Sequence, residues 1–134
     1  MVQLNTREKV VKLFAWALCA AFLMSCSQDV PCSEFTEGEF KLGTSSDVRI
    51  LRSGNTQKEY SLNPDEDFID EYRINWLDEC TYSATLEKTN RPESTSLAVG
   101  DSMMVKITDA AHDRYEWEGH VKGEIKKGIM IKVD

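Results

Sequence analysis

A regular alternation of side-chain character between residues 68 and 88 constrains the fold of this chain more than any other feature. Apolar and polar residues alternate along 68–77, and the pattern returns along 80–88. Alternation with a period of two is typical of antiparallel strands that have one buried and one solvated face. The face predicted to be buried carries Phe68, Tyr72, Ile74, Trp76, Cys80, Tyr82, Ala84 and Leu86.

Shorter segments with the same period flank this pair, so the sequence predicts about eight strands. They are expected at residues 34–42, 48–52, 57–62, 68–77, 80–88, 103–107, 115–121 and 128–133. A two-residue turn is expected at 54–55 (GN), and a polar loop at 89–101. Tight spacings of this kind indicate an up-and-down barrel or a sandwich. We favour an all-β fold, a small antiparallel up-and-down barrel with a lipocalin-like shape. Strands joined by short loops pair with their neighbours, and closure leaves no exposed edge.

The beginning of the chain has the organisation of an export signal. Three basic residues precede an uncharged apolar run of 12 residues at 13–24. That run is too short to cross a bilayer as a helix, which needs about 20 apolar residues, and it fits the apolar region of a signal peptide. A buried core helix is the alternative interpretation. Residues 23–26 (LMSC) resemble the lipobox of bacterial lipoproteins, and this resemblance implies that Cys26 is lipidated.

These features predict a lipoprotein signal peptide at 1–25, a lipidated tether at 26–31 and a β-barrel domain at 32–134. Residues 26–134 carry 13 basic and 22 acidic side chains, a net charge of −9, which disfavours nucleic acid as a partner. Ser27 follows the lipidated cysteine, and by analogy with enterobacterial sorting this favours the outer membrane over the inner one. We therefore expect a protein of the cell envelope that is attached to the membrane through Cys26.

Two further cysteines, Cys32 and Cys80, remain once the signal peptide is removed and Cys26 is lipidated. In an exported chain, two remaining cysteines favour a single disulfide. Two free buried thiols are the alternative. A metal pair is disfavoured, because neither cysteine lies in a CxxC motif or at ligand spacing from His112 or His120.

The sequence contains no convincing catalytic or metal site. His112 could pair with Asp109 or Asp113, but neighbouring carboxylates are the ordinary background of a polar loop. The acidic stretch 65–71 lacks the glycine of an EF-hand loop and is better interpreted as the solvated start of a strand. The motifs GxSxG and HExxH do not occur. We expect no enzyme activity, no cofactor and no metal.

Aromatic residues gather on the faces that are predicted to point into the barrel. An eight-stranded barrel either fills its interior with side chains or holds one small ligand. Core filling is the simpler interpretation, but buried tyrosine and tryptophan side chains also need hydrogen-bond partners. The candidate ligand-binding residues are Tyr60, Tyr72, Trp76, Tyr82, Tyr115 and Trp117.

Two short motifs resemble a family of small Bacteroidota lipoproteins. Residues 32–40 fit the opening C-x-x-F-x-x-G-x-F, and residues 76–82 fit the centre W-x-x-x-C-x-Y. The resemblance covers most of residues 26–134 and implies a disulfide-stapled β fold. It transfers no catalytic residue, since the family has no established activity. Some members carry a DNA topoisomerase IV label from automatic naming, which a short, acidic and exported chain does not support.

The function expected from these features is binding, either of a small apolar molecule inside the barrel or of an envelope protein outside it. A structural or assembly accessory of the envelope is the alternative, and a hydrolase-type enzyme is the third interpretation. A cavity lined by the aromatic residues would favour a small ligand. A filled interior with an exposed apolar patch would favour a protein partner.

Overall fold

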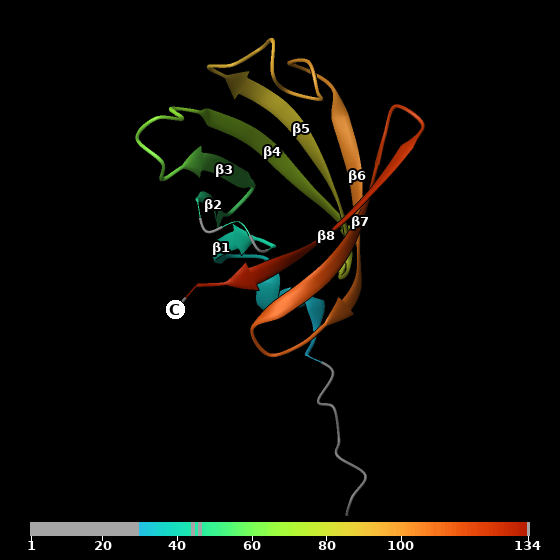
Figure 1. Cartoon of the computed structure of the whole chain (residues 1–134). Helices are drawn as coiled ribbons and strands as arrows, with labels where there is room; N and C mark the ends of the chain where they lie inside the picture. Colours follow the sequence, from blue (N-terminus) through green and yellow to red (C-terminus); the bar gives the residue numbers. More distant parts are fainter. Residues whose placement is uncertain (1–29, 44, 46, 134) are drawn as a thin grey trace, which may run out of the picture.

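The strands form one closed antiparallel barrel in which each strand pairs with the next and β1 also pairs with β8 (Figure 1). The computed structural model describes residues 30–43, 45 and 47–133. The predicted all-β up-and-down barrel is confirmed. The predicted signal peptide at 1–25 and the lipidation site Cys26 lie outside the described residues. The strands are β1 (Gly38–Leu42), β2 (Val48–Ser53), β3 (Thr56–Ser61), β4 (Ile69–Asp78), β5 (Thr81–Thr89), β6 (Ser102–Ala110), β7 (Arg114–Val121) and β8 (Glu124–Lys132).

The start of the barrel differs from the predicted strand at 34–42. Cys32–Phe35 form a short 3-10 helix, η2, and β1 begins only at Gly38. The amide of Glu34 donates to Pro31 O at 3.1 Å, which closes the first turn of η2. Gly38 has a φ of +132°, a conformation that L side chains rarely adopt. The chain therefore turns at this glycine, the residue with which it enters the sheet.

Two-residue hairpins fix the register of the sheet at both ends of the barrel. Gly54, with a φ of +56°, opens the predicted turn between β2 and β3. Lys122 and Gly123 both have positive φ, +47° and +79°, as a type I′ turn between β7 and β8 requires. The last strand consequently begins at Glu124, four residues before the predicted start at 128. Its first residues are polar or exposed, so hydrophobic periodicity did not reveal them.

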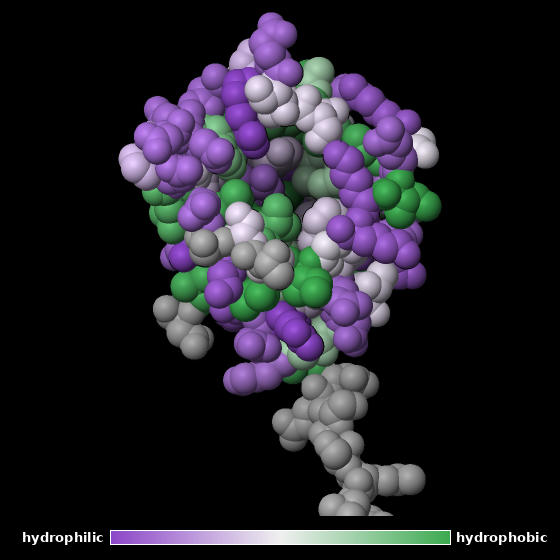
Figure 2. Space-filling view, in the orientation of Figure 1, coloured by the Kyte–Doolittle hydropathy of each residue, from purple (hydrophilic) through white to green (hydrophobic). Residues whose placement is uncertain are grey.

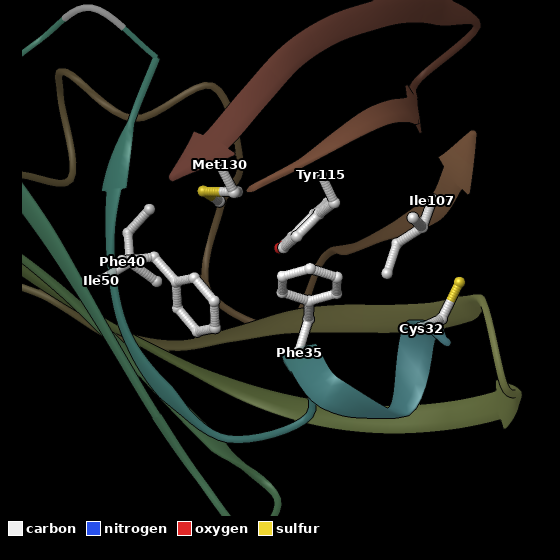
Figure 3. Packing of buried hydrophobic residues seen from close by; sticks show 7 residues of the cluster. All are labelled: Cys32, Phe35, Phe40, Ile50, Ile107, Tyr115 and Met130. Carbon is white, nitrogen blue, oxygen red and sulfur yellow. The ribbon is translucent and has the colours of Figure 1, made fainter. Parts of the chain in front are cut away.

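The end of the barrel that holds η2 is filled with packed side chains (Figure 3). Phe35 points from η2 into the barrel, and its ring centroid lies 5.0 Å from that of Tyr115 and 6.4 Å from that of Phe40. Phe35 and Phe40 are fully buried. Helix η2 thus plugs this end, which we call the closed end. The buried cluster consists of Cys32, Phe35, Phe40, Ile50, Ile107, Tyr115 and Met130.

A disulfide joins Cys32 of η2 to Cys80 in the turn between β4 and β5, with the two Cα atoms 5.2 Å apart. The predicted bridge is therefore confirmed, and the alternative of two free buried thiols is wrong. Its sequence separation is 48 residues. In the chain-entropy description, a loop of this size stabilises the fold by about 4 kcal/mol. The bridge attaches the plug to the wall of the barrel.

The opposite end of the barrel, which we call the open end, carries the loops that follow β1, β3, β5 and β7 (Figure 1). The longest of them joins β5 to β6, and its Leu97 turns inward to pack against Leu86 and Val121. Across the part of the chain that is described, no helix has the length and apolar character that crossing a membrane requires.

Candidate functional site

A cavity of about 200 Å³ occupies the interior between the packed closed end and the loops of the open end. Figure 2 shows the barrel hollowed at its centre, with hydrophobic and hydrophilic residues around the hollow. Most of the cavity wall is apolar. The apolar and aromatic lining residues are Leu42, Tyr72, Tyr82, Ala84, Leu97, Met103, Val105, Trp117, Val121 and Met130.

Two glycines give Trp117 its place in this wall. Gly128 lies opposite Trp117 in the ladder between β7 and β8. A Cβ atom built on Gly128 would lie 2.7 Å from Cζ2 of Trp117, and one built on Gly119 would lie 2.9 Å from Sδ of Met103. The indole therefore lies flat against the backbone of β8, and side chains at these positions would push it into the cavity.

A buried arginine forms the boundary between the cavity and the packed core. Arg52 is only 1% exposed. Its Nη1 donates to Phe35 O at 2.7 Å, its Nε to Gln57 Oε1 at 3.0 Å, and its Nη2 to Gln57 Oε1 at 2.7 Å. Nη2 also donates to the hydroxyls of Tyr82 and Tyr115, at 3.1 and 3.0 Å. The guanidinium thus links the η2 plug to three strands of the barrel.

Arg52 stays charged in this environment. Burial alone lowers the pKa of an arginine, but the hydroxyl groups of Tyr82 and Tyr115 outweigh that effect and the pKa of Arg52 is raised. The guanidinium carbon also lies 4.8 Å from the ring centroid of Tyr82 and 5.3 Å from that of Phe40. Aromatic faces attract cations at such distances.

Glu59 brings a carboxyl group into the cavity wall. It lies opposite Ile50 on β2 and Asp70 on β4, so its side chain shares their inward direction. Gln57 Nε2 donates to Glu59 Oε1 at 2.9 Å. Loss of solvent raises the pKa of Glu59, while the hydrogen bond from Gln57 opposes that shift. Arg52, Gln57 and Glu59 therefore form one polar chain that runs from the core to the cavity.

A buried carboxylate, Asp70, lies beside this chain but is fully paired. It is 1% exposed, and its two oxygens accept hydrogen bonds from Thr89 Oγ1 at 2.6 Å and from Arg91 Nη2 at 2.7 Å. Tyr72, two residues further along β4, lines the cavity. Desolvation, together with the negative charges of Glu59 and Asp70, raises the pKa of Tyr72. Its hydroxyl is therefore neutral under ordinary conditions.

The mouth of the cavity is formed by the loop between β5 and β6 and by the start of β8. Lys126 Nζ donates to Ser96 Oγ at 3.0 Å across this mouth. An ion pair of 2.9 Å between Lys122 and Asp101 ties the same loop to the β7–β8 turn. Leu97 of the same loop lines the cavity.

The predicted ligand-binding residues divide into three groups. Tyr72, Tyr82 and Trp117 line the cavity. Trp76 and Tyr115 point inward but belong to the packed core around Arg52. The expectation that Tyr60 points inward is wrong: it pairs with Arg49 and Ile69, on the face opposite to that of Gln57 and Glu59. Phe68, predicted as the first residue of the strand at 68–77, lies just outside that strand. It precedes β4 and lies under the guanidinium of Arg91, 3.6 Å from the ring centroid.

Sequence reasoning missed the polar residues of the interior, Arg52, Gln57 and Glu59. Their inward direction follows from the two-residue turn at Gly54, which places Arg52 opposite Gln57 and Ile50 opposite Glu59. The sequence indicates this turn, but the hydrophobic residues of β3 indicate the opposite phase for the strand. The strand pairing that this turn imposes is thus the sequence signal that could have placed these three residues inside the barrel.

The remaining candidate residues do not form a site. His112 is exposed in the β6–β7 turn, and the exposed His120 contacts Glu118 with Nε2 2.9 Å from Oε1. Within residues 30–43, 45 and 47–133, no group of three histidine, cysteine or carboxylate side chains is arranged to hold a metal ion. The acidic stretch 65–71 is divided, because Asp70 turns inside to meet Arg91 whereas Asp65, Glu66 and Asp67 are exposed.

Comparisons with protein-family models, with curated proteins and with solved structures find no match to this chain. The resemblance to small Bacteroidota lipoproteins therefore stays a prediction from its two motifs.

Proposed function

We propose that the protein is an envelope lipoprotein whose barrel binds one small, largely apolar molecule in the cavity at its open end. The observation that carries this proposal is the cavity itself, about 200 Å³ with a mostly apolar wall. An engineered cavity of about 150 Å³ in another protein is large enough to bind benzene. The volume here therefore suits a ligand with a single ring or a short aliphatic chain.

The alternative of a protein partner has less support. The exposed large hydrophobic side chains are distributed over several strands and two loops. Single exposed apolar residues are normal on protein surfaces, whereas an interface requires a contiguous patch. These residues are Leu51, Leu62, Ile69, Leu77, Val99, Met104 and Ile125.

The lipid anchor is the second part of the proposal and rests on the predicted lipobox at Cys26. The first described residues lie at the closed end, so an anchor upstream of Cys32 would direct the mouth of the cavity away from the membrane. A Cys26→Ser variant should remain an uncleaved precursor and fail to incorporate palmitate. Palmitate incorporation by this variant would refute the anchor.

Binding is tested by filling the cavity. The neutral probe 2-phenylethanol should bind the purified domain in a calorimetric titration. Ala84 lines the cavity and is buried, so Ala84→Leu should abolish binding. Ala111→Leu places the same change in the β6–β7 turn at the closed end and should leave binding intact. Thermal unfolding of both variants verifies that they are folded. Full binding of 2-phenylethanol by Ala84→Leu would contradict the proposal, as would failure of the unmodified protein to bind this probe or any charged probe of the same shape.

A further inference from the structure

One oxygen of Glu59 has no hydrogen-bond donor among the described residues. Gln57 Nε2 donates to Oε1, and no other donor reaches the carboxyl group. A carboxyl group held in a mostly apolar wall is unfavourable there unless a donor or a cation pairs with it. Glu59 lines the cavity, so a ligand can supply the partner that the protein does not.

The other charged groups inside the barrel are already paired. Asp70 is held by Arg91 at 2.7 Å. Arg52 is separated from the cavity by Gln57 and Tyr82, both of which accept its hydrogen bonds. Glu59 is therefore the charged group of the inner cavity wall that has no cationic partner within ion-pair distance in the described structure. The charge that would complete this wall is positive.

The surroundings of Glu59 also suit a cation. The Tyr72 hydroxyl makes no hydrogen bond to any residue that the structure describes. Tyr72 lines the same cavity as Glu59, and on the neighbouring strand it lies opposite Gln57, two residues from the position that faces Glu59. The hydroxyl oxygen of Tyr72 can therefore accept a hydrogen bond from a ligand that also donates to Glu59. The rings of Tyr72, Tyr82 and Trp117 line the same space, and aromatic faces attract a cation that has left water.

We infer that the ligand carries a protonated primary amine on a small apolar body, and that its ammonium group binds between Glu59 and Tyr72. This inference rests on the proposed function and adds the chemical class of the ligand. An ammonium group offers three donors, enough for the free oxygen of Glu59 and the hydroxyl of Tyr72. The apolar body then occupies the space bounded by Ala84, Val105 and Met130.

Three probes of similar shape and different charge test this inference. They are 2-phenylethylamine, 2-phenylethanol and phenylacetate, titrated separately into the unmodified protein. The amine should bind about 10-fold or more tightly than the alcohol, which corresponds to a hydrogen bond with a charged group. Phenylacetate should bind more weakly than either. Tightest binding by phenylacetate would overturn the inference and make Lys126 at the mouth the deciding charge.

Substitution of the carboxylate separates this inference from the proposed function. Glu59→Gln keeps the shape and the acceptor for Gln57, so its affinity for the amine should fall about 10-fold or more while its affinity for the alcohol changes less than about threefold. Tyr72→Phe should lower the affinity for the amine by a smaller factor than Glu59→Gln does. Glu116→Gln on the exposed face of β7 is the matched control and should change neither affinity.

The outcomes separate the two proposals. Equal binding of the amine and the alcohol, with no effect of Glu59→Gln on either, would refute the inference of an amine ligand but leave the proposal of a binding cavity standing. Failure of all three probes would overturn the cavity function itself.

Discussion

Replacement of Arg52 by methionine tests whether the buried guanidinium holds the plugged end of the barrel together. Methionine is unbranched, flexible and apolar and has a similar side-chain volume, so it removes the charge without opening a large cavity. Two pure acceptors, Phe35 O and Gln57 Oε1, lose donors at 2.7 Å. The hydroxyls of Tyr82 and Tyr115 also lose a donor, but they can rotate toward other groups.

The expected loss follows from these partners. Each buried acceptor left without a donor costs about 1–3 kcal/mol, which gives about 2–6 kcal/mol for Phe35 O and Gln57 Oε1 together. Part of this loss of stability is offset, because the variant no longer has to remove a cation from water when it folds. We therefore expect Arg52→Met to lower the free energy of unfolding by about 2–4 kcal/mol.

Urea unfolding followed by tryptophan fluorescence, with the disulfide intact, measures this loss. Arg114→Met at the exposed start of β7 is the matched control and should change stability by less than about 0.5 kcal/mol. A double-mutant cycle with Tyr115→Phe should give a coupling energy of about 0.5–3 kcal/mol, because the two side chains share a hydrogen bond. Equal or greater stability of Arg52→Met would refute the reasoning, since desolvation would then outweigh the hydrogen bonds.

Three further predictions concern the disulfide, the tryptophan and the cavity carboxyl group. The double variant Cys32→Ala/Cys80→Ala should lose about 2–5 kcal/mol in urea unfolding, and an unchanged midpoint would deny the bridge a stabilising role. Gly128→Ala should cost about 1–3 kcal/mol through overpacking against Trp117, measured by thermal unfolding; a neutral result would mean that the indole moves freely. Burial raises the pKa of Glu59, so the folded state binds this proton more tightly than the unfolded chain and loses stability as pH rises past about 4. Glu59→Gln should therefore be more stable than the parent at neutral pH, with an advantage that shrinks on acidification; a constant difference between pH 4 and 8 would contradict this.

The sequence predicted the barrel well where its hydrophobic pattern was regular. Strands β4 and β5 begin and end within a residue of their predicted limits, and Tyr82, Ala84 and Leu86 are buried as expected. The disulfide followed from the two cysteines that remain once the predicted signal peptide and the predicted lipidated cysteine are set aside. These features depend on local pattern and on counting, which a single sequence contains.

The interior polar residues could not be predicted from hydrophobicity alone. Strand β3 places Gln57 and Glu59 inside and the half-buried Tyr60 on the outer face, the reverse of what apolar patterning favours. This phase is stable because Arg52 on the neighbouring strand needs acceptors inside the barrel. Partners of this kind are set by tertiary contacts, so only the turn at Gly54 carried a local signal. The 3-10 plug likewise depends on the distant Cys80 and Tyr115.

Nuclear Overhauser contacts between bound 2-phenylethylamine and the protein test the central claim most directly. The account predicts contacts from the ring protons of the ligand to the side chains of Ala84, Val105 and Met130 inside the barrel. It also predicts contacts from the methylene group next to the ammonium to Tyr72. Contacts to Met104 and Ile125 on the exposed outer face, or no contacts at ligand saturation, would contradict a binding cavity within this barrel.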